Sequence, residues 1–192
     1  RVVDRGVVRH DVINLVASNS RAPGDIIGDC HAQIEATRVA EQEIFRLIGK
    51  YGVETVTTAF AAVQDYVERL TRARISEMPD GVWETEDHLD MDPGKEEKLV
   101  AVRVKMTIKG DEIYYALSAS DPAIASFLNS GHGVAFSGAI SSAKTFMPDI
   151  PLNSGFYRAI KVDVGPEGTC VNAGWPVAVT GGVAGAYEKI MN

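Results

Sequence analysis

The chain has 192 residues, of which 45% are hydrophobic and 23% charged, and its formal net charge is −7 at pH 7. These values are ordinary for a globular protein of one or two domains, and they disfavour the disordered, collagen-like and coiled-coil classes. A net negative charge without a Lys/Arg cluster argues against binding to nucleic acid or to a membrane surface. No apolar run reaches the roughly 20 residues of a membrane span. Two distant cysteines, Cys30 and Cys170, offer no disulfide framework and favour a reducing, cytoplasmic compartment.

The first 80 residues carry a helical pattern. Apolar residues from Val12 to Val16 form a short helical face, and a second helix is predicted over 28–50, ended by Gly52. In a third helix the apolar residues step by three and four from Val53 to Leu70, which is the spacing of one buried face. The tight break at Gly52 predicts that the two long helices pack as an antiparallel hairpin. We expect the large side chains of this face, Phe60 among them, to be buried.

After Gly81 the hydrophobic period changes to two, which indicates strands. Strands are predicted over 82–88 and 100–108, with a charged loop over 90–98 between them. A turn at 109–111 then leads into a hairpin partner over 113–117.

Small residues dominate from 118 to 142 and predict a closely packed helix, capped at Asp121-Pro122 or at Asn129-Ser130. A last strand pair is predicted over 157–164 and 169–172. Helices that precede strands are typical of an α+β fold. We therefore expect a helical segment over 1–80 and a mainly antiparallel β segment over 81–192, both parts of one larger subunit.

Two short stretches supply candidate binding residues. His132 lies between Gly131 and Gly133, and glycines on both sides allow the backbone to approach a ligand. A structural turn before a closely packed helix has the same pattern. Asp29 and His31 stand near the predicted start of the second helix, where Asp29 either caps exposed N–H groups or has a functional role.

The histidines give no sign of a metal centre. The chain has four, at positions 10, 31, 88 and 132, and none is spaced from another as in a local zinc motif. The sequence therefore predicts no metal site in this segment. Glu84, Glu86 and His88 share one face of the first strand, and we interpret them as a solvated strand edge, with a carboxylate–imidazole cluster as the alternative.

The loop over 148–158 combines Pro, Asn, Gly and Arg. Asn153 offers both a donor and an acceptor, and Arg158 offers a planar cationic fork, so both residues suit an anion or an amide. A folding or interface role, with Arg158 paired to Asp149 or Asp163, is equally well supported. There is no GxSxG elbow and no nucleophile–base set, so the catalytic residues are unknown.

Several stretches, in the same order, resemble the hydantoinase B/oxoprolinase family. They are Gly28-Asp29 with Ala32-Gln33-Ile34 and Ala36, Lys50-Tyr51-Gly52, Leu70 and Ala73 with Met78-Pro79-Asp80-Gly81, Pro148-Asp149-Ile150-Pro151-Leu152-Asn153-Ser154-Gly155 through Arg158, and Pro166-Glu167-Gly168-Thr169 with Asn172. Together these stretches extend over nearly the whole chain. Each motif alone is weak, but their collinear order is specific. Cys30-His31 depart from the Leu-Arg that family members often carry.

The resemblance implies a function for the larger protein. The family includes ATP-dependent hydantoinases, 5-oxoprolinases and the large subunits of acetone and acetophenone carboxylases. It implies a hetero-oligomer in which a hydantoinase A-type partner uses ATP to phosphorylate a carbonyl oxygen. The B-type subunit then completes ring opening of a cyclic amide or carboxylation of a ketone. A divalent metal is implied for the full subunit, with its ligands in an upstream segment.

Three alternatives follow for this chain. Residues 153–158 and 185–192 resemble the ketone carboxylases more closely, which favours a ketone carboxylase. A cyclic-amide hydrolase is the second alternative, and a non-catalytic assembly module is the third. We expect the chain to be an inner piece of its subunit, because a helix opens near Tyr187 without a capping glycine after it. We also expect these 192 residues to be inactive alone.

Overall fold

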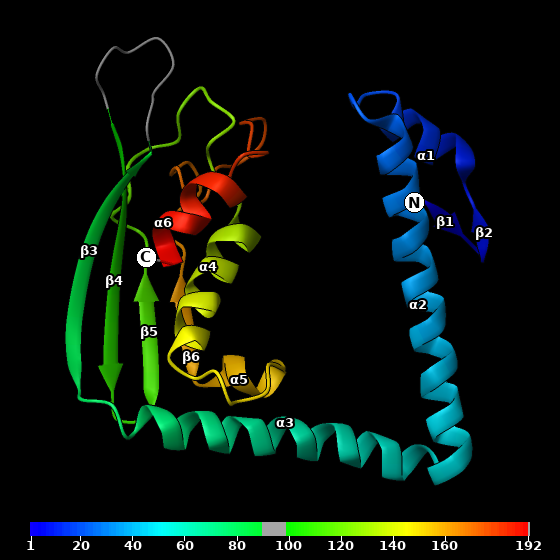
Figure 1. Cartoon of the computed structure of the whole chain (residues 1–192), viewed down its shortest axis with the longest axis horizontal. Coiled ribbons are helices and arrows are strands. Elements are labelled where there is room, and N and C mark those ends of the chain that lie inside the picture. Colours follow the sequence, from blue (N-terminus) through cyan, green and yellow to red (C-terminus); the bar gives the residue numbers. More distant parts are fainter. Residues whose placement is uncertain (90–98, 192) are drawn as a thin grey trace. The chain divides into compact units, whose positions relative to one another are not determined.

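A computed structural model describes residues 1–89 and 99–191. The chain divides into two compact units, 1–60 and 61–192, and their boundary falls within a helix. Figure 1 shows the elements in sequence colours. The separation of a helical segment from a β segment near residue 80 stays a prediction. The antiparallel packing of the two long helices also stays a prediction, because the second of these helices spans the boundary between the two units. The predicted loop over 90–98 lies outside the described residues.

The first unit is mainly helical. Its elements are the small hairpin β1 (Val3–Asp4) and β2 (Val7–Val8), α1 (His10–Ala17), α2 (Pro23–Tyr51) and the start of α3 (Val53–Ile75). α2 begins five residues before the predicted start because Pro23 suits the first turn of a helix. It ends as predicted, with Gly52 in a positive-φ conformation, φ +82°.

The expectation of a fully buried face on α3 is wrong. Val56 and Val67 are 5% and 1% exposed, but Phe60 is 46% and Val63 is 55% exposed. The spacing of apolar residues identifies a helical face correctly, but it does not show which turns of a 23-residue helix are covered.

The second unit contains a four-stranded sheet in the order β3-β4-β5-β6. The strands are β3 (Gly81–Leu89), β4 (Val100–Lys109), β5 (Glu112–Ala116) and β6 (Ile160–Asp163). β3, β4 and β5 pair antiparallel, as predicted, whereas β6 pairs parallel to β5. The α+β fold with a mainly antiparallel sheet is therefore confirmed.

The predicted last strand pair is wrong as a pair: its first strand, predicted over 157–164, contains β6, but β6 pairs with β5 and not with 169–172. Residues Ser154–Arg158 form the short helix α5, and 169–172 contribute only isolated bridges, one of them between Pro122 and Thr169. β6 lies beside β5, and the chain just beyond β6 packs against the loop after β5. An added Cβ at Gly165 would lie 2.6 Å from the Cα of Ser118.

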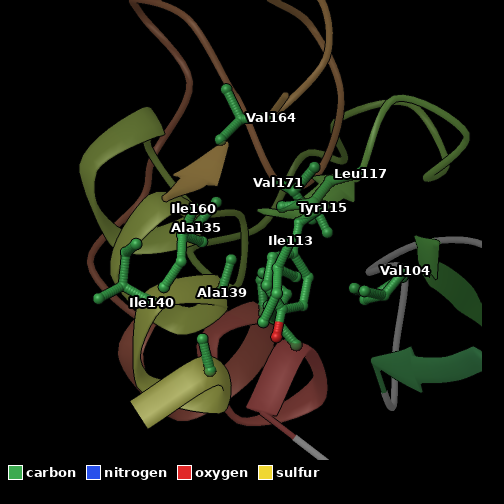
Figure 2. Packing of buried hydrophobic residues seen from close by; sticks show 14 of the residues in the cluster. Val104, Ile113, Tyr115, Leu117, Ala135, Ala139, Ile140, Ile160, Val164 and Val171 are labelled. Atoms are coloured by element: carbon green, nitrogen blue, oxygen red, sulfur yellow. The ribbon is translucent and has the colours of Figure 1, made fainter. Parts of the chain in front are cut away.

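Helices cover one face of this sheet, as Figure 1 shows for α4 (His132–Thr145) and α6 (Glu188–Met191). A π-helical turn, Val183–Tyr187, precedes α6. α4 begins after Gly131, so neither predicted cap is used. Its small residues permit close packing: Ala135, Ala139 and Ala143 are fully buried, and Figure 2 shows two of them near Ile113 and Tyr115 of β5.

The other face of the sheet carries ion pairs between β3 and β4 and from β4 to the loop after β5. Glu84 on β3 binds Lys105 on β4 at 2.9 Å, and Arg103 binds both Glu86 and Asp121. His88 Nε2 lies 3.3 Å from Glu86, so the residues predicted to share a face do so. No helix in the described part of the chain is long and apolar enough to cross a membrane.

Candidate functional site

The predicted loop over 148–158 ends in α5, which lies against α3. Asn153 caps α5, because its side-chain oxygen accepts a hydrogen bond from the backbone N–H of Gly155 at 2.8 Å. Phe156 is fully buried. An added Cβ at Gly155 would lie 2.0 Å from the backbone oxygen of Gln64 on α3. The two helices therefore approach each other at a point that only glycine permits.

Arg158 joins α5 to α3. Its guanidinium donates to Asp65 at 2.7 Å, to Glu68 at 3.1 Å and to the side-chain oxygen of Gln64 at 3.1 Å. The hydrogen bond to Asp65, and then that to Glu68, raises the pKa of Arg158. The fork that suits an external anion is thus occupied by acceptors of the protein itself. This geometry favours a positioning role, with partners other than the two carboxylates suggested by the sequence.

The network continues along α3 to the sheet. Arg72 binds Glu68 at 2.9 Å, Asp111 at 3.2 Å and Glu112 at 3.3 Å, and it also donates to the carbonyl of Arg158. The hydrogen bond from Arg72 is the main cause of the lowered pKa of Glu68. A carboxylate with a lowered pKa stabilises the folded state at neutral pH, and this contribution is lost as the pH falls through the lowered pKa.

We expect Arg158→Lys to lower the thermal midpoint of the chain. Two separate guanidinium nitrogens of Arg158 reach Asp65, Glu68 and Gln64, and the single nitrogen of a lysine does not reproduce this planar geometry. Salt should make the difference smaller, since these groups are exposed. Arg74→Lys is the matched control, because Arg74 pairs with Glu77, which lies two residues beyond the end of α3 and not on α5. An unchanged midpoint together with lost activity in the whole enzyme would show that Arg158 recognises a ligand, which stays a prediction.

His132 is the exposed first residue of α4, and its ring begins an aromatic row. It stacks on Phe136, with ring centroids 6.5 Å apart, and Phe136 meets Tyr157 of α5 edge-to-face at 6.0 Å. The structure therefore brings His132 close to α5, and through Tyr157 to the neighbourhood of Arg158. No ligand role of His132 is tested by this geometry.

Asp29 and His31 lie in the first unit, in the interior of α2 and not at its start. Because α2 begins at Pro23, Asp29 is beyond the first turn and does not cap the helix. His31 lies beside His10 of α1, with ring centroids 5.6 Å apart. A functional role of either residue stays a prediction.

Residues 1–89 and 99–191 contain no group of three or more His, Cys, Asp or Glu side chains that could hold a metal ion. The implied divalent metal therefore has no matching donor set among them. Cys170 is fully buried, and this burial raises the pKa of its thiol to about 11, so it is not a nucleophile at neutral pH.

Sequence reasoning missed a cluster of two loops, 123–130 and 173–182, which we call the loop cluster. Asn129 was predicted as a possible helix cap, but it is a fully buried amide between the two loops. A pocket of about 610 Å³ lies between residues 123–127 and 176–178. Trp175 is 95% exposed. The signal in the sequence is that neither loop contains a charged residue.

Comparisons with known proteins give consistent results. A family model described as hydantoinase B/oxoprolinase matches residues 1–192. The beta subunit of the caprolactamase of Pseudomonas jessenii is 35% identical over 174 residues, which are 90% of this chain and 29% of that protein. The B subunit of a putative D-/L-hydantoinase of Pseudomonas sp. (strain NS671) is 31% identical and is matched over 92% of this chain and 31% of its own length.

Solved structures support the same fold. The ATP-dependent caprolactamase from Pseudomonas jessenii has a TM-score of 0.82 at 28% identity, over 99% of this chain and 33% of that one. Nucleotide-free acetone carboxylase has a TM-score of 0.78 at 16% identity, over 95% of this chain and 26% of that one, which shows the fold alone. The chain spans about a third of the length of the relatives it matches.

Proposed function

The chain belongs to the hydantoinase B/oxoprolinase family, and from this membership we propose that it is one segment of the B-type subunit of an ATP-dependent enzyme that acts with a hydantoinase A-type partner. The family match over 1–192 carries the proposal. Two relatives are named as the beta subunit of a caprolactamase and the B subunit of a putative hydantoinase, and these names support a hetero-oligomer.

Hydrolysis of a cyclic amide is the reaction we propose first. It is supported by identities of 35% with the caprolactamase relative and 31% with the hydantoinase relative. An unactivated amide resists attack by water, and transfer of a phosphoryl group to its oxygen makes the carbonyl carbon more electrophilic. In this scheme ATP is bound by the A-type partner.

Carboxylation of a small ketone is the second candidate. It is supported by residues 153–158 and 185–192, which resemble the ketone carboxylases more closely than the hydrolases. Phosphorylation of the enol oxygen would also serve this reaction, because the enol is then held as its phosphate. Attack of water on phosphorus breaks the P–O bond and releases phosphate, while the enol carbon forms its bond to carbon dioxide and the carbonyl re-forms.

Within the full-length protein we propose a scaffolding role for this segment. Several charged groups of its described residues form ion pairs, as in Arg158 with Asp65 and Arg103 with Glu86. Such pairs position helices and strands, whereas catalytic groups need access to substrate. We therefore propose that the reacting groups and the divalent metal belong to other parts of the complex.

The test is an activity assay on the whole B-type protein, co-purified with its A-type partner. We expect release of ADP and phosphate to require a lactam or a hydantoin and to match the ring-opened acid in amount. Turnover only with acetone and bicarbonate would select the second candidate. The 192-residue chain alone is the control and should be inactive. ATP-dependent turnover by that chain, or no stable complex with the partner, would contradict the proposal.

A further inference from the structure

The side chain of Lys144, in the last turn of α4, ends in a cage of carbonyl oxygens. Its ammonium donates to the backbone oxygens of Met147 at 2.9 Å and Pro148 at 2.8 Å, and also to that of Ile150. An ammonium group has three N–H donors. Each donor therefore has one carbonyl acceptor, and all three acceptors lie just beyond the end of a helix.

This cage needs a positive charge. The carbonyl dipoles of residues 147, 148 and 150 converge on one point, so their partial negative charges repel one another in the absence of a cation. The end of α4 adds to this field, because the last carbonyls of a helix also carry partial negative charge. Three carbonyl oxygens at such distances from one centre resemble the coordination that backbone carbonyls give to potassium.

The cage holds a turn whose first and last side chains, Met147 and Ile150, are buried in the core. Met147 is 1% and Ile150 is 8% exposed, and the N–H of Ile150 donates to the Met147 carbonyl at 3.2 Å. This turn leads directly to Asn153, which caps α5. A displacement of the turn would therefore displace the cap and the contact between α5 and α3.

We infer that Lys144 is a built-in cation that positions the turn 147–150, and that the three carbonyl oxygens form a site for a potassium or ammonium ion once this side chain is shortened. Lys144 is thus a positioning residue for α5. The inference does not rest on the proposed function, because it concerns only contacts within the second unit.

Hydrogen exchange measured on peptides covering 146–158 tests the inference in the 192-residue chain. Lys144→Ala should raise amide exchange there by about tenfold in tetramethylammonium chloride, whose cation is too large for the cage. Potassium or ammonium chloride at equal ionic strength should restore protection. Wild-type protection should be the same in all three salts, because the site is already filled.

Two variants separate the charge from other effects. Lys144→Met keeps the apolar stem but removes the charge, so we expect the same loss of protection without rescue. Lys109→Ala removes an exposed lysine at the end of β4 and should change nothing in 146–158. Wild-type protection in Lys144→Met would overturn the inference, as would a loss in Lys144→Ala that neither potassium nor ammonium reverses.

Discussion

Gly155→Ala should destabilise the chain by about 3 kcal/mol, at the upper end of the range for overpacked sites. The new Cβ would lie 2.0 Å from the backbone oxygen of Gln64 and 3.0 Å from the Asn153 side-chain oxygen. A backbone atom in the middle of α3 cannot move as a flexible side chain does. α5 must therefore retreat, which exposes part of Phe156 and lengthens the contacts of Arg158.

The measurement is the free energy of unfolding from urea denaturation of the 192-residue chain. Gly133→Ala is the matched control, since it makes the same exchange on α4 and its Cβ would meet nothing within 4 Å. That control should be neutral or stabilising by up to about 1 kcal/mol, because alanine favours helix more than glycine does. Equal effects of the two substitutions would show that α5 does not lie against α3 as described.

The strands were predicted well from local patterns. Predicted strands 82–88, 100–108 and 113–117 differ by at most one residue at each end from β3, β4 and β5. One face of these strands is buried, so alternation along the sequence directly reflects the structure. β6 lies within the strand predicted over 157–164, but its partner was not predicted, because β6 pairs with β5, a segment some 47 residues earlier in the chain.

For the loop over 148–158, the sequence identified the polar residues but not the groups that they contact. The side-chain chemistry of Asn153 and Arg158 made the loop a candidate site, but their hydrogen-bond partners could not be predicted. Arg158 binds Asp65, which precedes it by 93 positions, and not the nearby carboxylates. Such a pair depends on the docking of α5 on α3. Phe60 illustrates the same limit, because periodicity defines a helical face but not what covers it.

The local sequence pattern predicts Asn129 as a helix cap, but in the structure its side chain joins two loops. Its side-chain oxygen accepts from the N–H of Ile124 at 2.9 Å. Its side-chain nitrogen donates to the carbonyls of Ile124 at 2.8 Å, Ser126 at 2.6 Å and Ala178 at 3.2 Å. One fully buried amide thus satisfies backbone groups on both loops of the loop cluster.

Asn129→Ala should therefore cost about 3–5 kcal/mol, because several buried or half-buried backbone groups lose their partner and a cavity remains. We expect urea denaturation to show this loss and hydrogen exchange to rise in 173–182. Asn172→Ala is the control, since its amide donates to the Gly165 carbonyl outside that segment, and it should leave exchange in 173–182 unchanged.

A third variant, Asn129→Asp, tests whether the donors of the amide are needed. The carboxylate keeps an acceptor for Ile124 but faces the carbonyls that the amide had bound, so its charged form is disfavoured on folding. Its pKa should then be raised in the folded state, and the penalty should shrink as the pH falls through that raised value. If Asn129→Ala loses less than about 1 kcal/mol, or if Asn129→Asp is as stable as the wild type at neutral pH, the amide does not join the loops.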